Sequence, residues 1–190
     1  MRHNLIFILI ILAKLSYGQS DQLRVNKSKS YIKYEGDHLL HSWEGTNDKV
    51  NGLAIFNPKK KTLQKLAILL YVRDFDSQNS GRDAHALEVL EALKYPEIKF
   101  YSESIKIENE NLIINGIFDF HGKQIKKTFS ASYKNQDSKW IIFGEFKLTP
   151  TDFDINLPSF LSIKMEDLLE IKYNIEPVSY THLRAHETDR

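Results

Sequence analysis

The stretch 98-IKFYSESIKIENENLIINGIFDFHGKQIKKTFSASY-133 decides the fold, because apolar and polar side chains alternate along most of it. In its last segment, 125–133, the even-numbered positions are lysine, threonine and serine. The odd-numbered positions include Ile125, Phe129, Ala131 and Tyr133. A period of two residues is that of a β-strand with one buried face and one face in water. The stretch therefore predicts antiparallel β-structure.

Two turn signals divide this stretch into three strands. Asn109-Glu110-Asn111 and His121-Gly122 are polar or glycine-containing breaks between apolar runs. Within 98–107 the apolar residues change parity midway. One extra residue in a strand has this effect, so we expect a β-bulge near Ser102–Ser104.

Similar runs continue through most of the chain, separated by turn formers such as Asn57-Pro58 and Asn135-Gln136-Asp137. The other strands that we expect are 30–35, 38–45, 50–56, 65–72, 139–148 and 167–175. There is no strand–helix–strand rhythm that would favour a parallel sheet. The pattern favours an all-β fold, an antiparallel barrel or a sandwich.

One short amphipathic helix interrupts the strands. Ser80 and Asp83 have the spacing of a capping box, with Ser80 as the N-cap. One face of the helix is apolar and consists of Ala86, Val89, Leu90 and Leu93. Lys94-Tyr95-Pro96 ends it, because the residue before a proline is forced out of the helical region. A single helix in an all-β chain is expected to plug one end of a barrel.

Both ends of the chain differ from the rest. Residues 1–18 combine a basic start, an apolar run and small residues at a cleavage position, which predicts a secretory signal peptide. The apolar run 5–13 is too short for a stable membrane span. The strand pattern stops after Pro177, and 178–190 is expected to be a non-native or disordered tail. The folded domain is therefore expected over 19–177, exported to the periplasm or secreted.

Several function classes are disfavoured. The 190 residues carry a formal net charge of +1 without a basic stripe, so nothing favours nucleic acid. There are no cysteines, which excludes disulfides. The histidines lack the spacing of a metal site, since His38 and His41 would point to opposite faces of one strand. No nucleophile motif or apolar carboxylate pair predicts an enzyme.

The helix and its flanks carry a family signature. The residues that form it are Ser77, Asn79, Arg82, Asp83, His85, Tyr95, Pro96, Ile98, Phe100 and Ser102. The stretches 41-HSWEG-45 and 115-NGIFDFHG-122 agree with it. Together they resemble the YceI-like family, the lipocalin-like polyisoprenoid-binding proteins of bacteria, and within it the branch common in Bacteroidetes. The likeness covers Ser28 to about Glu176.

The resemblance implies an antiparallel lipocalin-like barrel of about eight strands with a long apolar cavity. It also implies an isoprenoid-type lipid, a polyprenyl or quinone-like chain, as the ligand, with no cofactor or metal. The residues that we expect to line the cavity are Ile32, Tyr34, Trp43, Leu53, Ile68, Leu70, Phe100, Phe118, Trp140 and Phe146. Each is equally consistent with a solid core. The residues expected at the polar mouth are Arg82, Asp83, His85 and His41.

Two interpretations of the mouth stay open. In the structural one, Asp83 caps the helix and Arg82 bonds the carboxylate of Asp74 or Asp76. In the functional one, Arg82 and the helix N-terminus accept the head group of a lipid. The segment 157–167 is expected to form an apolar lid-like loop over one rim.

Two functions also stay open. The first is a periplasmic or secreted lipid carrier, with a homodimer possible. The second is a non-enzymatic stress-response or protein-interaction scaffold with a packed barrel and no lipid.

Overall fold

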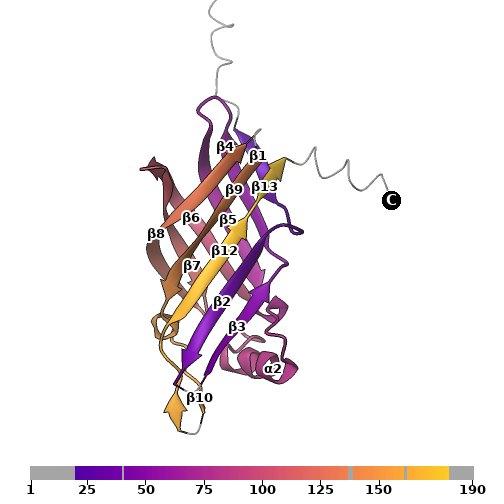
Figure 1. Cartoon of the computed structure of the whole chain (residues 1–190), viewed down its shortest axis with the longest axis vertical. Helices are drawn as coiled ribbons and strands as arrows, with labels where there is room; N and C mark the ends of the chain where they lie inside the picture. The colour runs from indigo at the N-terminus through magenta and orange to yellow at the C-terminus, as the bar shows by residue number, and fades with distance from the viewer. Residues whose placement is uncertain (1–19, 40, 137–138, 161, 180–190) are drawn as a thin grey trace, which may run out of the picture.

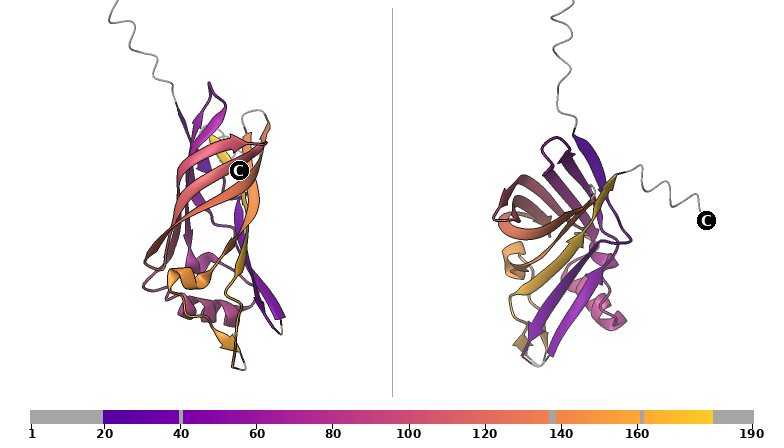
Figure 2. Two further views of the ribbon diagram at one scale, coloured as in Figure 1. Left: turned by 90° about the vertical axis from the view of Figure 1, so that its left-hand side faces the viewer. Right: turned by 45° about the horizontal axis from the view of Figure 1, so that its top comes forward.

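The computed structural model describes residues 20–39, 41–136, 139–160 and 162–179. They form an antiparallel sheet of eleven strands in the order β13-β1-β4-β5-β6-β7-β8-β9-β12-β2-β3, with a separate two-stranded hairpin, β10-β11. The large sheet curls around the core, and the helix α2 (Ser80–Val89) lies at one end of the curl (Figures 1 and 2). The all-β class and the position of the helix are confirmed. The predicted signal peptide lies outside the described residues.

The strands follow the alternating runs of the sequence. Their bounds are β1 Asp21–Val25, β2 Tyr31–His38, β3 His41–Asn47, β4 Asn51–Asn57, β5 Thr62–Tyr71, β6 Glu97–Glu108, β7 Asn111–Phe120, β8 Lys123–Gln136, β9 Lys139–Leu148, β10 Ser159–Phe160, β11 Ile163–Lys164, β12 Leu169–Ile175 and β13 Pro177–Ser179. Two 3-10 turns, η2 Val72–Asp74 and η3 Pro150–Phe153, complete the described elements. There are more strands than the roughly eight expected, in part because β1 and β13, which lie outside the runs that we expected, extend the sheet at one edge. Strand β13 ends at Ser179, two residues beyond Pro177, where we predicted that the folded domain ends.

We expected the run 38–45 to be one strand. In the structure it forms the turn and the second strand of a hairpin. Strand β2 ends at His38 and β3 begins at His41, and these two residues are partners across the hairpin. Their rings lie 5.5 Å apart, so the prediction that they point to opposite faces is wrong. His38 is buried, with Nε2 3.0 Å from the carbonyl oxygen of Ile163, while His41 is exposed. The hairpin thereby contacts the β10-β11 segment.

The predicted β-bulge and turn are confirmed. The register between β6 and β7 shifts between Ser102 and Ser104. At the shift, the buried Ser102 hydroxyl accepts a hydrogen bond of 2.8 Å from the backbone N–H of Leu66 on β5. The β7–β8 turn has His121 and Gly122 at φ of 51° and 75°, the left-handed conformations that a two-residue hairpin requires.

The helix is shorter than predicted. It ends at Val89, and Glu91 then takes a positive φ of 45°, which the α-helix does not allow. Leu93 lies beyond this break and is fully exposed, so its placement on the buried face is wrong. Leu87 and Leu90 pack against the core instead.

Several side chains around Trp140 of β9 are completely buried, and we call this part of the interior the solid core. Trp140 is completely buried there, with its ring 5.6 Å from that of Phe56 and stacked 5.1 Å from that of Tyr133. Leu112 and Ile142 are also completely buried. Neither they nor Trp140 are among the residues that line the cavity described below.

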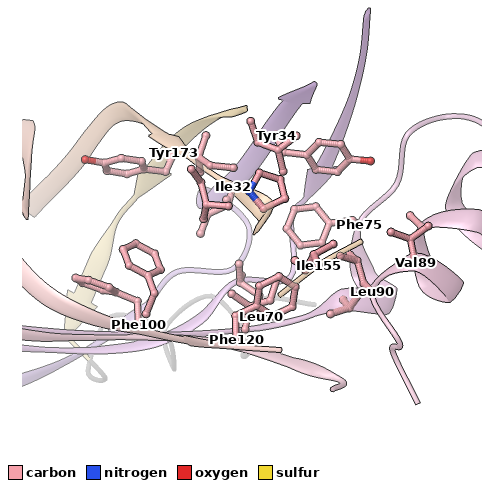
Figure 3. Close-up of a pocket in the computed structure, with 18 of the residues that line it drawn as sticks. Ile32, Tyr34, Leu70, Phe75, Val89, Leu90, Phe100, Phe120, Ile155 and Tyr173 are labelled. Atoms are coloured by element: carbon pink, nitrogen blue, oxygen red, sulfur yellow. The ribbon is translucent and has the colours of Figure 1, made fainter. Parts of the chain in front are cut away.

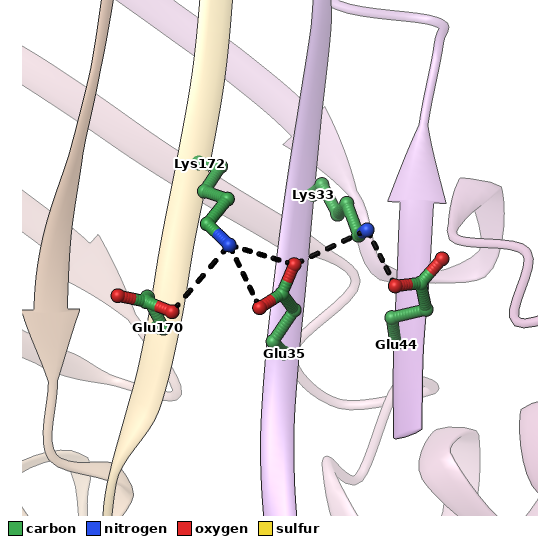
Figure 4. Close-up of polar contacts among 5 residues, drawn as sticks. All are labelled: Lys33, Glu35, Glu44, Glu170 and Lys172. Atoms are coloured by element: carbon green, nitrogen blue, oxygen red, sulfur yellow. Dashed lines mark hydrogen bonds and ion pairs between the residues drawn. The ribbon is translucent and has the colours of Figure 1, made fainter. Parts of the chain in front are cut away.

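The outer face of β12, β2 and β3 carries a charge network (Figure 4). Lys172 lies 2.8 Å from Glu35 and 3.5 Å from Glu170, and Lys33 pairs with Glu35 and Glu44. Hydrogen bonds from Lys172, and after it from Lys33, lower the pKa of Glu35 below its ordinary value of 4.5. At neutral pH these ion pairs therefore connect the three neighbouring strands β12, β2 and β3.

Replacing Ser102 with alanine tests the role of the bulge. The change leaves the backbone N–H of Leu66 buried without an acceptor, which costs about 1–3 kcal/mol. We expect urea unfolding to show a loss of this size. Ser130→Ala, on an exposed position of β8, is the matched control and should change stability little; equal losses in the two variants would contradict the assignment.

Replacing Glu35 with glutamine tests the charge network. Because the folded-state pKa of Glu35 is lowered, its ionised form stabilises the fold above the ordinary glutamate pKa, and this contribution disappears as the pH falls through the folded-state value. We expect Glu35→Gln to melt below the wild type near neutral pH and the gap to close below about pH 4. Melting curves across this range measure it, and a gap that is constant with pH would refute the assignment.

Candidate functional site

A cavity of about 300 Å³ lies inside the curl of the sheet, between α2 and the solid core (Figure 3). Its wall is almost wholly apolar. Strand residues such as Ile68 and Leu70 of β5 form one side. Leu87 of α2 and Leu90, which follows the helix, close the end. Leu157, Pro158 and Met165, which flank the β10-β11 hairpin, also contribute, so the predicted lid-like segment does border the cavity.

The polar end of the cavity, which we call the mouth, consists of Arg73, Arg82, Asp83 and His85. Arg73 and His85 are exposed and Arg82 and Asp83 are half-buried, so this end meets solvent. Arg73 follows β5 in η2, and the other three belong to the first turns of α2. The sequence thus places its charged helix start next to the opening.

Side-chain hydrogen bonds fix the start of α2. The N-cap is Asn79 and not Ser80, as we expected: its Oδ1 accepts from the backbone N–H of Arg82 at 3.0 Å. Asp83 accepts hydrogen bonds from both the backbone N–H and the hydroxyl of Ser77, at 3.0 and 2.6 Å. Asp83 therefore has the structural role, and it ties the loop that precedes the helix to its first turn.

Arg82 does not have the structural role that we considered for it. Asp74 pairs with Lys49 at 3.3 Å, and Asp76 accepts from the backbone N–H of Gln78 at 2.7 Å. Within the described part of the chain, the guanidinium of Arg82 has no hydrogen bond or ion pair. A half-buried cation at the rim of an apolar cavity is thus available for an anionic or polar group.

Tyr34 of β2 lines the cavity close to the mouth. Its ring lies 5.6 Å from that of Phe75, and its phenol is close enough to α2 to respond to the charges there. Burial, with a smaller contribution from the carboxylate of Asp83, raises the pKa of Tyr34, and Arg82 opposes the shift. Tyr34 is therefore a neutral hydroxyl at any physiological pH.

Deeper in the cavity, five rings from neighbouring strands form what we call the aromatic belt. Its members are Phe100 of β6, Phe118 of β7, Phe129 of β8, Phe146 of β9 and Tyr173 of β12. Phe129 and Phe146 stack at 5.0 Å, and Phe100 and Phe118 lie 4.8 Å apart. Such packing makes a continuous aromatic wall.

Two glycines leave space for rings of the aromatic belt. A Cβ on Gly116 would clash with the ring of Phe100, and a Cβ on Gly144 would lie 2.9 Å from the hydroxyl of Tyr173. The hydroxyl of Tyr173 is buried without a hydrogen-bond partner among the described residues, and burial raises its pKa above the ordinary value. An unpaired hydroxyl costs about 1–3 kcal/mol.

Most of the residues predicted for the cavity and its mouth do lie there. In the wall are Ile32, Tyr34, Trp43, Ile68, Leu70, Phe100, Phe118 and Phe146, and at the mouth Arg82, Asp83 and His85. The structure does not bring Leu53, Trp140 or His41 to the cavity. Leu53 is 40% exposed because the opposite parity of β4, Ala54 and Phe56, is buried. Trp140 belongs to the solid core, and His41 lies in the hairpin with its ring 5.8 Å from that of Trp43.

Sequence reasoning missed several wall residues, among them Phe75, Phe129 and Tyr173. The signal for the last two was present, since each lies on the apolar parity of an alternating strand. Phe75 follows η2 in a loop, where no strand or helix periodicity indicates that its side chain points inward.

The described residues contain no group of three or more side chains suited to a metal ion. None of their helices has the length and hydrophobicity to cross a membrane. Besides the mouth, the lining residues with polar side-chain atoms are Lys99, Trp43, Tyr34 and Tyr173.

Comparison with known sequences identifies relatives. A family model described as YceI-like domain matches residues 23–177. The Protein YceI of Salmonella newport is 28% identical over 115 residues, which is 58% of this chain and 60% of that protein. The Protein YceI of Salmonella arizonae matches to the same extent. The chain thus matches about three fifths of the length of these curated relatives.

Solved structures share the fold. BcnA of Burkholderia cenocepacia has a TM-score of 0.71 at 17% identity, over 80% of this chain and 98% of that one. A polyisoprenoid binding domain from Saccharophagus degradans has a TM-score of 0.68 at 7% identity, over 83% and 98%. The YceI protein of Campylobacter jejuni has a TM-score of 0.60 at 22% identity, over 74% and 87%. With the family model matching nearly all of the folded region, the chain belongs to the YceI-like family.

Proposed function

We propose that the protein is a carrier for an isoprenoid-type lipid, a polyprenyl or quinone-like molecule whose chain lies in the cavity. The observation that carries this proposal is the cavity itself: an almost wholly apolar space whose charged lining residues, apart from Lys99 of β6, belong to η2 and α2. This is the arrangement of a site for an amphipathic ligand. The polyisoprenoid binding domain of Saccharophagus degradans, which shares the fold, supports the proposal.

Burial of the chain supplies the affinity. Apolar surface removed from water contributes about 25 cal/mol per Å². An empty apolar cavity also forfeits dispersion contacts, which a bound chain restores. The structure has no need of a catalytic group for this role, and we propose a binding protein and not an enzyme.

The head group of the lipid would lie at the mouth, on Arg82. Its guanidinium is unpaired within the described residues, and the N-terminus of α2 adds positive potential beside it. A phosphate, a carbonyl or a quinone oxygen can accept hydrogen bonds from it.

We place the carrier in the periplasm or outside the cell, on the basis of the predicted signal peptide at 1–18. The alternative, a scaffold with a packed barrel, is less favoured because the inner face leaves a cavity of about 300 Å³ unfilled. A scaffold has no use for such a space, which lowers stability.

Native mass spectrometry of the full chain, exported in a bacterial host and followed by solvent extraction, tests the carrier role. We expect a lipid adduct on the wild type and its loss in Leu70→Gln, which places an amide in the cavity wall. Leu53→Gln makes the same change on the exposed side of the neighbouring strand and should keep the adduct. Circular dichroism would check that both variants fold.

A bare protein mass for the folded wild type, together with no binding of added prenols, would refute the carrier role.

Arg82→Ala tests the head-group site. Hydrogen bonds to a charged group contribute about 1.5–3 kcal/mol, so we expect farnesyl phosphate to bind at least about tenfold more weakly. Farnesol, which has the same chain without the phosphate, is the matched ligand and should lose little. Dissociation constants from calorimetry decide it, and an equal effect on both ligands would show that Arg82 acts on the fold and not on the head group.

A further inference from the structure

Two hairpins, β2-β3 and β10-β11, project at the same end of the molecule as α2 (Figures 1 and 2). They contact each other through two polar interactions. Nε2 of the buried His38 lies 3.0 Å from the carbonyl oxygen of Ile163. The backbone N–H of Glu166 donates to the carbonyl oxygen of Asp37 at 3.0 Å. The two hairpins therefore form one continuous surface.

This surface exposes large apolar side chains. They are Leu39 in the β2-β3 turn, Ile163 of β11 and Leu168 next to β12, with exposed fractions of 77%, 39% and 37%. We call these three the tip residues. Each lies within two residues of a group that joins the hairpins. Apolar side chains that gather on one exposed surface indicate an interaction site.

The tip residues are connected to the cavity by a short segment of chain. Pro158 and Met165 lie on either side of the β10-β11 hairpin, and both line the cavity. The backbone N–H of Met165 donates to the carbonyl oxygen of Pro158 at 3.0 Å, which closes the base of the hairpin. The same hairpin thus has cavity wall at its base and the exposed Ile163 further out.

We propose that the tip residues insert into a lipid bilayer, from which the protein collects its ligand or to which it delivers it. This inference rests on the proposed carrier function and adds the partner. An isoprenoid chain that crossed water would expose its apolar surface again, at a cost of about 25 cal/mol per Å². Contact between this end of the protein and a bilayer avoids that step.

The size of the surface favours a bilayer over a protein partner. Stable protein interfaces bury about 800 Å² on each partner, which is more than three side chains provide. A bilayer requires no matching shape, because its hydrocarbon adapts to any inserted side chain. The exposed charges beside the tip residues have both signs, as in Asp37, Lys164 and Glu166. Apolar insertion, and not attraction to anionic lipid, is therefore the driving force.

Flotation with phosphatidylcholine vesicles tests the proposal. The full chain is exported in a bacterial host and its intact mass is checked, because a retained signal peptide would itself insert into vesicles. We expect the wild type to float with the vesicles. The double variant Leu39→Ser/Ile163→Ser should partition at least about tenfold more weakly, because two exposed apolar side chains are lost.

The matched control is Leu53→Ser/Ile107→Ser, which makes the same two exchanges at exposed positions of β4 and β6. It should float like the wild type. Adding phosphatidylglycerol to the vesicles should leave the binding of all three proteins unchanged. Circular dichroism would check folding, and Leu39→Ser alone replaces the double variant if the latter does not fold.

A tryptophan at the tip reports insertion directly. Leu39→Trp places an aromatic ring that suits the bilayer interface at the most exposed tip residue. With lipids whose acyl chains carry bromine, we expect quenching of the emission that this ring adds to that of Trp43 and Trp140. Leu53→Trp is the control and should keep its added emission. Equal quenching in the two variants would contradict the assignment.

Farnesol binding, measured by calorimetry on the wild type and the Leu39→Ser/Ile163→Ser variant, separates this proposal from the carrier function. Equal farnesol binding together with weaker flotation of the variant supports it. If the wild type binds farnesol but does not float, or if the variant floats equally well, the carrier function stands and the docking surface is overturned. If the substitutions abolish a dimer in native mass spectrometry and leave flotation unchanged, the surface joins two copies of the chain and the proposal is likewise overturned. If farnesol does not bind the wild type, both ideas are refuted.

Discussion

The curled sheet encloses more space at the α2 end than its side chains fill, and the rest of the structure depends on this imbalance. In the solid core, Trp140 and its neighbours Leu112 and Ile142 have no exposed surface. At the helix end the inner face carries Phe and Leu side chains that line a space without occupying it. Void space lowers stability, and the apolar chain of the proposed ligand would restore the lost packing contacts on binding.

The same imbalance explains where the polar groups lie. A charge inside the apolar space would lose its hydration without compensation. Apart from Lys99, the charged residues that line the cavity belong to η2 and α2, where Asp83 accepts two hydrogen bonds from Ser77. The mouth thus combines a carboxylate, Asp83, that holds the start of the helix with a cation, Arg82, that is unpaired among the described residues.

Much of this architecture could be predicted from the sequence, because alternation reports the burial of each strand face directly. The bulge at Ser102 was visible as a change of parity, and the turn at His121-Gly122 as a glycine break. The hairpin between His38 and His41 was not, since the connection is Leu39-Leu40 and carries no turn-forming residue. Strand β4 is apolar on both parities, so the outward direction of Leu53 was not decidable before the register was known.

The candidate site could be predicted only in part. The wall residues were recognisable as inward-facing, but the same residues could have packed into a solid core. Whether Trp140 lines a cavity or closes it depends on how far the sheet curls, and this is a property of all the strands together. The N-cap of α2 could not be predicted for a different reason. Asn79 and Ser80 are both good N-cap residues, and only the backbone geometry of the structure distinguishes them.

The way that α2 is attached has a consequence for the timing of exchange. None of its ten residues is fully buried, and the chain before it is joined to the edge strand β3 by one isolated bridge, in which Thr46 and Asp76 exchange two backbone hydrogen bonds of 2.9 Å. Segments held by few buried contacts open locally at a free-energy cost far below that of global unfolding. The helix end can therefore detach and rejoin on the microsecond-to-second scale while the sheet stays intact. Amide protons of α2 would exchange with solvent long before those of β7 and β8. In the proposed carrier, a lipid would enter and leave at the rate of this local opening.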